Sequence, residues 1–386
     1  MHDKEKYSIC FCYEMNCGGE TAATEAIIKE LRESPDIRIL SHSHSPLIHT
    51  DFIRFFFWIF RSIFFWIWII YKNRQVDWIY TTTFTAGVAA ALVKPFGSYK
   101  IAWHFHGNRI PPSPKEYKGK TYITQVIKQW AVQKLHELFL RNTDLIFVPT
   151  VQSKRWLIGT IPYTHRSAIC IIPNGVDLQR FHPLSPVLRQ RLRKKYKVHD
   201  STHVFLSVGR IEKHKGLALG IQTAALVVAK NENMRWIIIH PHITNDPEQK
   251  YKAYLERAID AKRLKQKVVW IQDPDRIEEY YHIADVTLSF SQFEFFPLTM
   301  LESFACGTLY IGHAAGNVGP FVSQIDRRLL LTSRNPRTIA KHLQALCLLP
   351  RKEKQKIQRK GRDLVLYYSW NQTVRIMQKY LTDSPV

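Results

Sequence analysis

The amino-acid sequence predicts an α/β protein of two doubly wound domains, each with a parallel sheet covered by helices. Three observations support this prediction. The chain has 386 residues, and at ~100–200 residues per domain this length suggests two domains. Apolar runs of strand length alternate with helical patterns along the chain, which is typical of parallel strands joined by crossover helices. A stretch rich in proline, asparagine and glycine, residues 173–186, separates two such series.

The first series alternates from the start of the sequence. Its apolar runs predict strands at 7–13, 37–40, 76–80, 100–105, 144–149 and 168–173. Its helical patterns lie at 20–33, 52–71, 84–93 and 123–141. We assign residues 1–175 to this first domain, and we expect a last helix, within 367–386, to cross back onto it.

The second series, residues 176–366, repeats the architecture without repeating the sequence. Its predicted strands lie at 204–209, 235–240, 267–272, 285–291, 308–313 and 328–331. Its predicted helices lie at 216–229, 247–264 and 276–284, followed by one that carries Glu302 and by two more. Ligands of open α/β sheets bind at the carboxyl ends of the strands. We therefore expect the functional residues just after strands, facing a central cleft between the two domains.

The charge of the chain is strongly unbalanced. Lysine and arginine number 55 against 32 aspartates and glutamates, a formal net charge of +23. Such a field favours an anionic partner, which includes nucleic acid, a phosphorylated substrate and acidic lipid. The basic residues are scattered and form no known nucleic-acid-binding motif, so we expect no nucleic-acid partner. The 6 cysteines contain no C-x-x-C pair, which indicates a reducing compartment without disulfides.

The segment from Phe52 to Tyr71 departs from the composition of a soluble protein. It is as long as a membrane-spanning helix, ~20 residues, but a spanning helix would bury Arg54 or Arg61 at a cost of about 2.5–3.5 kcal/mol. Its apolar residues surround the helix, and its tryptophans (58, 66 and 68) suit a membrane interface. We favour peripheral docking on a membrane, and the alternative is a helix wholly buried in protein.

Two glycine- or cation-containing turns are candidate phosphate sites. Gly18 and Gly19 stand between the first strand and the first helix, where a helix N-terminus attracts anions. A structural turn explains these glycines equally well. In the second domain, Arg210 follows an apolar strand and Lys215 precedes a helix. A guanidinium fork and a point charge together suit a diphosphate, and the alternative is a solvated charged loop.

The stretch "FEFFPLTMLESFACGTL" places Glu294 and Glu302 with seven residues between them. Pro297 suits the first turn of a helix that starts after the strand 285–291. Glu294 then lies before the helix and Glu302 two turns inside it. Carboxylates at this position can accept hydrogen bonds from hydroxyl groups, which sugars supply in number. For Glu302 the alternative is a carboxylate on a helix surface.

Five motifs in order resemble the glycosyltransferase family 4 (group 1) enzymes, which are retaining nucleotide-sugar transferases of the GT-B fold. They are "GGE", "IIPNGVDLQRFHP", "VGRIEKHKG", the two spaced glutamates with "FACG" behind them, and "YYSWNQTVRIMQKYL". The resemblance runs over nearly the whole chain. It implies that the first domain lies on the acceptor side and that the second binds the nucleotide sugar, with a UDP- or GDP-linked donor expected.

The resemblance also implies a role for each candidate residue. Arg210 and Lys215 would bind the diphosphate and stabilise the charge of the leaving group. Glu294 would bind hydroxyls of the donor sugar, and Glu302 those of the ribose. The backbone at Phe296, Pro297 and Leu298 would contact sugar and phosphate. His106 resembles the family's active-site histidine, with His104 as the competing candidate.

The resemblance leaves several points open. It implies a metal-independent reaction, so we expect neither a metal nor a cofactor, and we interpret His42, His44 and His49 as an exposed loop. The expected acceptor is a membrane-lipid-linked or cell-envelope glycan, reached from the cytoplasmic face of a membrane. Phe295 stands where many relatives have glycine, and a phenylalanine there can narrow the sugar pocket. The alternative function is a non-catalytic protein that keeps the GT-B fold and binds membranes or polyanions.

Overall fold

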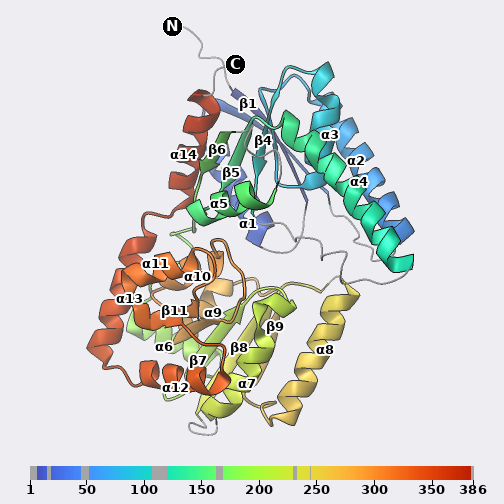
Figure 1. Cartoon of the computed structure of the whole chain (residues 1–386). Coiled ribbons are helices and arrows are strands. Elements are labelled where there is room, and N and C mark those ends of the chain that lie inside the picture. The colour runs from blue at the N-terminus through green and yellow to red at the C-terminus, as the bar shows by residue number, and fades with distance from the viewer. Residues whose placement is uncertain are drawn as a thin grey trace. The chain divides into compact units, whose positions relative to one another are not determined.

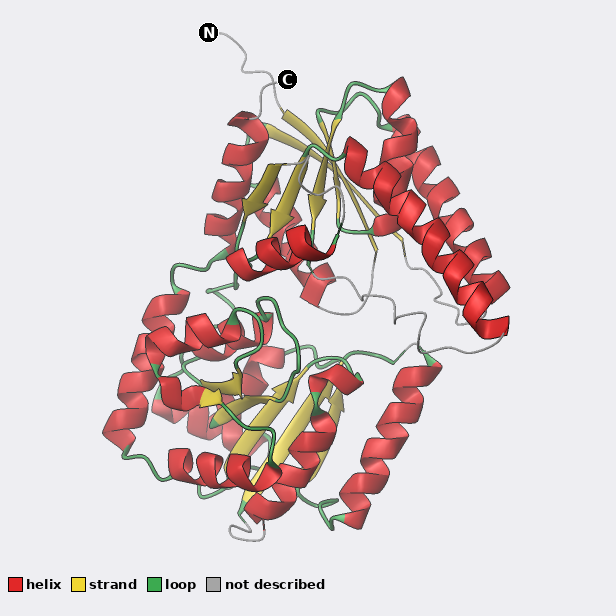
Figure 2. Cartoon of the chain, in the orientation of Figure 1, coloured by secondary structure: helices red, strands yellow, loops and turns green. Residues whose placement is uncertain are grey.

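The structure is a computed structural model that describes residues 7–14, 19–44, 52–106, 120–161, 168–228, 233–243 and 245–383, with the backbone alone at 52–58 and 120–129. The chain forms two compact units. Unit 1 comprises Met1–Pro173 with Thr373–Val386, and unit 2 comprises Asn174–Gln372. In each unit, helices flank a central sheet (Figure 2). The boundary predicted from the sequence lies after residue 175, and the predicted return is a helix within 367–386.

Unit 1 is built on a parallel sheet of 6 strands in the order β2-β1-β3-β4-β5-β6. The strands are β1 (Tyr7–Glu14), β2 (Ile37–His44), β3 (Trp78–Thr81), β4 (Lys100–His104), β5 (Leu145–Val148) and β6 (Ala168–Ile171). Strands β3 and β5, inside the sheet, are fully buried, as expected of strands covered on both faces.

The helices of unit 1 cover both faces of this sheet (Figure 1). They are α1 (Gly19–Arg32), α2 (Phe52–Lys72), α3 (Phe84–Val93), α4 (Lys120–Asn142), α5 (Val151–Thr160) and the returning α14 (Trp370–Asp383). Trp103 of β4 packs on Phe139 of α4, with ring centroids 5.4 Å apart. On the opposite face, Phe147 of β5 packs on Tyr380 of α14. Helix α14 therefore contributes to the core of unit 1.

Strand β2 is longer than predicted. It pairs with β1 from Ile37 to His44, so His42 and His44 belong to a strand and not to an exposed loop. The ring of His44 stacks on Phe65 of α2 at 4.6 Å between centroids. The polar sequence obscured this strand because β2 lies at the sheet edge, where polar residues are tolerated. His49 lies outside the described residues.

Helix α2 has a buried face and an exposed aromatic face. The buried face includes Ile59, Ile63, Trp66 and Ile70. Among the side chains that the structure describes on α2, from residue 59 on, four aromatic ones are exposed: Phe60, Phe64, Trp68 and Tyr71, at 53%, 67%, 55% and 48%. We call these four residues the aromatic stripe. Trp66, which was predicted at a membrane interface, is instead fully buried, because its position falls on the face that packs on the protein. Among the described residues, no helix is both long and apolar enough to cross a bilayer.

Unit 2 has a second parallel sheet of 6 strands, in the order β12-β11-β10-β7-β8-β9. The strands are β7 (His203–Val208), β8 (Met234–His240), β9 (Val268–Gln272), β10 (Val286–Ser289), β11 (Leu309–His313) and β12 (Leu330–Leu331). The helices are α6 (Pro186–Lys195), α7 (Leu217–Val228), α8 (Asp246–Ala261), α9 (Ile277–Ile283), α10 (Leu298–Ala305), α11 (Val318–Ile325), α12 (Pro336–Cys347) and α13 (Arg351–Val365).

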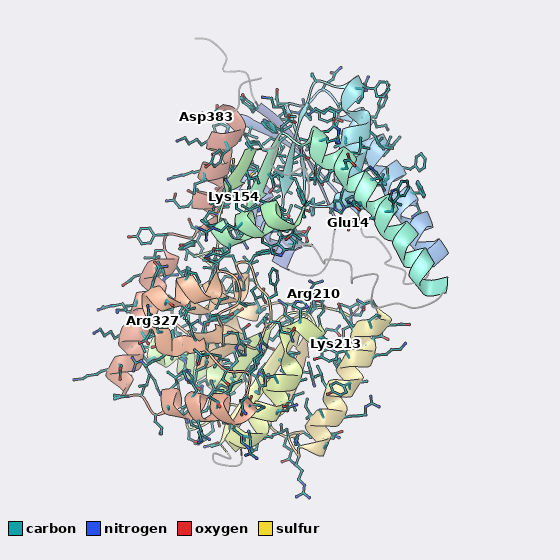
Figure 3. The ribbon with its side chains drawn as sticks, in the orientation of Figure 1. Glu14, Lys154, Arg210, Lys213, Arg327 and Asp383 are labelled. Atoms are coloured by element: carbon teal, nitrogen blue, oxygen red, sulfur yellow. The ribbon has the colours of Figure 1, made fainter. Side chains whose placement is uncertain are left out.

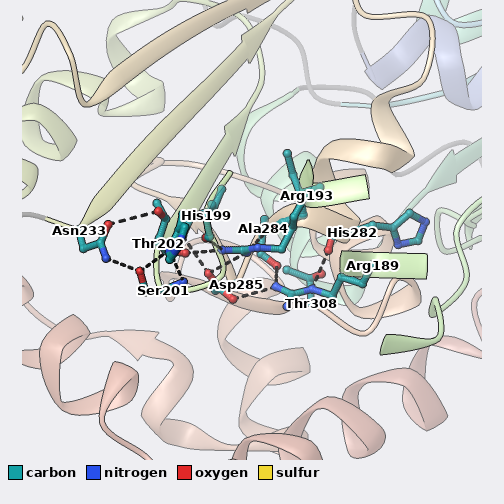
Figure 4. Close-up of polar contacts among 12 residues, drawn as sticks. Arg189, Arg193, His199, Ser201, Thr202, Asn233, His282, Ala284, Asp285 and Thr308 are labelled. Carbon is teal, nitrogen blue, oxygen red and sulfur yellow. Dashed lines mark hydrogen bonds and ion pairs between the residues drawn. The ribbon is translucent and has the colours of Figure 1, made fainter. Parts of the chain in front are cut away.

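A polar cluster ties α6 to the amino end of this sheet (Figure 4). Arg193 is 3% exposed and donates to the carbonyl oxygens of Ile283 and His199 at 2.8 and 3.0 Å. Asp285 accepts from Arg189 at 2.8 Å and from the backbone N–H of Val204 at 2.8 Å. These contacts join α6 to the segment between α9 and β10 and to the start of β7.

Candidate functional site

The loop after β7 positions the first cation. Gly209 directly follows the strand with φ of +150°, a conformation that favours glycine, and its N–H donates to the carbonyl oxygen of Ile239. Arg210 then leaves the sheet at its carboxyl edge (Figure 3). Its guanidinium pairs with Glu212 at 2.9 Å, and its side chain is 38% exposed. Arg210 is therefore oriented by a neighbouring carboxylate and still open to a ligand.

Gly216 fixes the position of Lys215. The short 3-10 helix η4 (Lys213–Lys215) ends at Gly216, whose φ is +71°. A Cβ atom there would lie 2.2 Å from the carbonyl oxygen of Phe290, so only glycine fits. The N–H of Gln292 donates to the carbonyl of His214 at 2.7 Å. The cationic loop is thus packed against the segment that follows β10.

The packing of these two segments brings Lys215 and Glu294 together. The ammonium of Lys215 donates to Oε1 of Glu294 at 2.6 Å, although the residues are 79 positions apart. The two side chains are 23% and 16% exposed. The packing of the two segments thus holds this ion pair in place, and both side chains keep some exposure to solvent.

The backbone around Glu294 is held from two sides. Asn174 donates from its side-chain amide to the carbonyl of Phe296 at 2.9 Å. Gly316, with φ of +55°, packs so closely that a Cβ atom would lie 1.5 Å from the carbonyl oxygen of Glu294. Phe295, at the position where a phenylalanine can narrow the sugar pocket, is 7% exposed and packs on Phe293 at 4.6 Å between ring centroids.

Helix α10 starts directly after Pro297, which was predicted to lie in its first turn. Pro297 is its N-cap, with φ of −70° and ψ of 130°, and the first helical residue is Leu298. The side chain of Pro297 makes no capping hydrogen bond. In the first turn, the N–H of Met300 donates to the carbonyl oxygen of Pro297 at 3.2 Å, and the N-terminus of a helix is a place where anions bind.

Glu302 is directed towards α9. The hydroxyl of Tyr281 donates to Oε2 of Glu302 at 2.6 Å. Burial raises the pKa of Glu302 above its ordinary value, while the Tyr281 hydroxyl and the charge of Arg180 oppose this rise. Tyr281 was missed by sequence analysis because its partner is 21 positions away and no local pattern connects the two.

A pocket of about 30 Å³ connects several of these residues at the carboxyl edge of the unit 2 sheet. Arg210, Lys215 and Glu294 line it together with Ser289 and Thr299. Three of the predicted site residues are therefore gathered in one place, whereas Glu302 is not part of its lining. This volume accommodates water, but not a nucleotide sugar.

The histidine candidates lie in unit 1, at and just after the end of β4. His104 is 1% exposed, and its ring centroid lies 3.8 Å from that of His106. Burial lowers the pKa of His106 to about 4, and burial, with the charge of His106, lowers the pKa of His104 well below its ordinary value. Both imidazoles are therefore neutral at physiological pH.

The glycine turn of unit 1 is only partly described. Gly19 is the first residue of α1 and is exposed, while Gly18 lies outside the described residues. Within the described ranges, no group of three histidine, cysteine, aspartate or glutamate side chains is arranged to hold a metal ion. Whether the glycine turn binds phosphate stays a prediction.

Two protein families match the chain. The family described as glycosyl transferases group 1 matches residues 189–364, and the family described as Glycosyltransferase Family 4 matches residues 18–180. Together these segments cover most of both units.

Individual relatives are distant. The chain is 25% identical over 247 residues to a lipopolysaccharide 1,2-N-acetylglucosaminetransferase of Salmonella typhimurium, covering 62% of each protein. It is 27% identical over 244 residues to a D-inositol 3-phosphate glycosyltransferase of Geodermatophilus obscurus, covering 62% of this chain. The chain thus spans 62% and 52% of the lengths of these two relatives.

A solved structure shares the fold over nearly its full length. The crystal structure of Anabaena Alr3699/HepE in complex with UDP and glucose matches with a TM-score of 0.73 at 17% identity, covering 97% of this chain and 99% of that one. This likeness confirms the predicted α/β fold of the GT-B class.

Proposed function

The chain belongs to the group 1 glycosyltransferases of the GT-B fold, and we propose that it transfers a sugar, with retention of configuration, from a nucleotide diphosphate sugar to a lipid-linked or cell-envelope glycan. One observation carries the proposal. Arg210, Lys215 and Glu294, from two segments of unit 2, line one pocket at the carboxyl edge of the sheet. Two cations beside a carboxylate match a ligand that has a diphosphate next to a sugar.

The diphosphate would replace existing partners. Arg210 now pairs with Glu212, and Lys215 with Glu294, at 2.9 and 2.6 Å. A phosphate that approaches these cations gains charge-assisted hydrogen bonds to groups that are already oriented. Glu294 would then accept from hydroxyls of the donor sugar, while the first N–H groups of α10 contact sugar or phosphate. Glu302 is assigned to the ribose hydroxyls in the same proposal.

Transfer then exchanges one bond to the anomeric carbon for another. The bond from this carbon to the phosphate oxygen breaks, and its electron pair leaves with the phosphate, whose charge Arg210 and Lys215 stabilise. The acceptor hydroxyl attacks on the same face and gives its proton to the leaving phosphate. No carboxylate pair is needed as acid and base, and His106 of unit 1 is assigned to the transferred sugar. We propose no metal, because fixed cations serve the diphosphate.

The exposed face of α2 supports the proposal that the acceptor lies in a membrane. Its aromatic stripe presents three large side chains more than half exposed, at positions 60, 64 and 68. The ammonium of Lys72 lies 3.9 Å from the Trp68 ring centroid, and the guanidinium of Arg74 lies 4.2 Å from that of Tyr71. Aromatic rings with cations at one end suit the interface of an anionic membrane. We therefore propose peripheral attachment to the cytoplasmic face of a membrane.

The small pocket favours a second candidate. A volume of about 30 Å³ is also compatible with a non-catalytic protein that keeps the fold and binds membranes or polyanions. The two candidates differ in whether a nucleotide sugar binds.

Calorimetry with UDP-, GDP- and ADP-sugars separates these candidates. The glycosyltransferase proposal expects one donor to bind to the wild type and to lose affinity in Arg210→Ala. The matched control is Arg257→Ala, since Arg257 is exposed on α8 and does not line the pocket. The anomeric configuration of the product, read by NMR, tests retention, and turnover in excess EDTA tests metal independence. Folded protein without any donor signal would favour the non-catalytic candidate.

A further inference from the structure

A buried tyrosine and a buried histidine in unit 1 are joined by a hydrogen bond. Tyr80 of β3 and His104 of β4 lie on neighbouring strands and are each 1% exposed. The hydroxyl of Tyr80 is hydrogen-bonded to Nδ1 of His104. The proposed function makes no use of Tyr80, and the sheet core would be satisfied by phenylalanine there, as it is at Phe11 and Phe147 beside it.

This hydrogen bond determines the tautomer of His104. Burial raises the pKa of the Tyr80 phenol well above its usual value, so the phenol keeps its proton. His104 is neutral and carries a single ring proton. Nδ1 of His104 is the partner that the structure shows for the phenol, so the phenol donates to it. Nδ1 therefore accepts, and the ring proton of His104 lies on Nε2.

His104 in turn packs on His106. Their ring centroids are 3.8 Å apart and the ring planes differ by 36°. Nε2 of His104 and Nε2 of His106 are both enclosed, and neither has a hydrogen-bond partner among the described residues. Thr82, just beyond β3, adds a third such atom, Oγ1. Because Thr81 pairs with Trp103, Thr82 and His104 are the next residues on neighbouring strands.

Enclosed polar atoms without a partner are rare in folded proteins and call for an explanation. Here three of them gather at the carboxyl edge of two adjacent strands, where ligands bind in this class of fold. A hydroxyl of a ligand would supply the missing partner of His106, which follows the end of β4. The Tyr80 hydroxyl, in contrast, already has its partner and faces His104, so its role is to orient this ring.

We propose that Tyr80 and His104 are positioning residues for His106. Tyr80 holds His104 in one orientation and one tautomer, and the His104 ring fixes the plane of His106, so that Nε2 of His106 is presented to a hydroxyl of the substrate. The proposal rests on the proposed function for the identity of that substrate, but the arrangement of the three rings is independent of it.

The test compares two tyrosine-to-phenylalanine variants. Tyr80→Phe removes the hydroxyl that orients His104. Tyr99→Phe is the matched control, because Tyr99 is also 1% exposed in unit 1 and its hydroxyl donates to the backbone carbonyl of Ala90 at 2.6 Å. Both variants lose one buried hydroxyl, so both lose comparable stability. The imidazole nitrogen signals of protein labelled with ¹⁵N-histidine report the tautomers, and acceptor-dependent kinetics report kcat and KM.

In Tyr80→Phe we expect the His104 and His106 signals to shift, with His104 becoming a mixture of tautomers, while Tyr99→Phe keeps the wild-type signals. We expect kcat to fall about tenfold in Tyr80→Phe with little change in acceptor KM, since misplacing a reacting group costs turnover. If Tyr80→Phe does not fold, His104→Gln keeps an acceptor for Tyr80 and must still shift His106.

Unchanged histidine signals in Tyr80→Phe, or in His104→Gln where Tyr80→Phe does not fold, overturn the proposal. So do shifted signals combined with a kcat equal to that of Tyr99→Phe. A wild type that turns over no donor argues against the proposed function instead. In that case the NMR comparison still decides whether Tyr80 orients the two histidines.

Discussion

At the scale of residues, the candidate donor site depends on which charged groups are paired and which are open to a ligand. Lys215 and Glu294 form an ion pair with 2.6 Å between Nζ and Oε1. The neighbouring Lys213 is instead exposed, on the same 3-10 helix. An oriented cation contributes more to anion binding than a solvated one, because less side-chain freedom is lost on binding. Two cations two residues apart should therefore differ in function.

Replacing Lys215 by alanine should weaken donor binding by about 10- to 100-fold, because a hydrogen bond to a charged group contributes about 1.5–3 kcal/mol. Lys213→Ala is the matched control, and it should change the dissociation constant by no more than about twofold. Titration calorimetry with the donor measures both. Equal losses in the two variants would mean that the loop acts only through its total charge.

Glu302 should make stability depend on pH. Because burial raises its pKa above 4.5, the folded protein keeps a proton there after the unfolded chain has lost it. The stability that this retained proton contributes is complete below the pKa of Glu302 in the unfolded chain. It is lost as the pH rises through the pKa of Glu302 in the folded protein. Glu302→Gln keeps an oxygen for the Tyr281 hydroxyl and carries no charge. The variant should therefore gain stability relative to the wild type as the pH rises from about 4.5.

Urea denaturation at several pH values measures this difference, with the exposed Glu25→Gln as the control. If Glu302 also binds the ribose, Glu302→Gln should lose donor affinity while it gains stability at neutral pH. A difference between the variant and the wild type that stays constant with pH would contradict the raised pKa.

At the scale of elements, glycines decide where the cationic loop can lie. Gly216 ends η4 with a positive φ and lies against the segment after β10, and Gly316 packs against Glu294 in the same way. These close contacts join the ends of β7, β10 and β11 into one surface. The side chains of the candidate site are positioned by this backbone packing and not by the helices themselves.

Gly216→Ala should destabilise unit 2 by about 2 kcal/mol or more, because the new Cβ meets a backbone oxygen and the residue must keep a positive φ. Gly159→Ala is the control, since nothing lies within 4 Å of its Cβ position in α5. That substitution should be neutral or stabilising by up to about 1 kcal/mol. Chemical denaturation gives both values, and equal stabilities would show that the loop can move away.

At the scale of the whole molecule, charge and exposed aromatic area should act together. In the proposed attachment to a membrane, the net charge of +23 would attract the chain to anionic lipid, and the aromatic stripe would supply apolar area once contact is made. The first effect is long-range and weakened by salt, whereas the second is short-range and confined to one helix. The two contributions can therefore be separated.

Phe64→Glu should reduce binding to vesicles that contain anionic lipid by about tenfold or more. The substitution replaces apolar area that the membrane would bury with a charged group. Leu348→Glu is the control. Leu348 lies in unit 2 and is 84% exposed, and its substitution by glutamate changes the net charge by the same amount. Flotation at low and high salt measures both variants. Equal losses would mean that net charge, and not the aromatic stripe, holds the protein on the membrane.

The sequence by itself determined the fold class, the alternation of strands and helices, and the placement of Arg210, Lys215 and Glu294 just after strands. These follow from local patterns, since the period of apolar residues and the chemistry of turns are properties of neighbouring residues. Only the tertiary structure decided that His42 and His44 belong to a strand, that Trp66 is buried while Trp68 is exposed, and that Glu302 is paired with Tyr281. It also decided that Tyr80 holds His104. Contacts of this kind join residues far apart in the chain, and they depend on strand register and on which helix face packs inward, which no local pattern encodes.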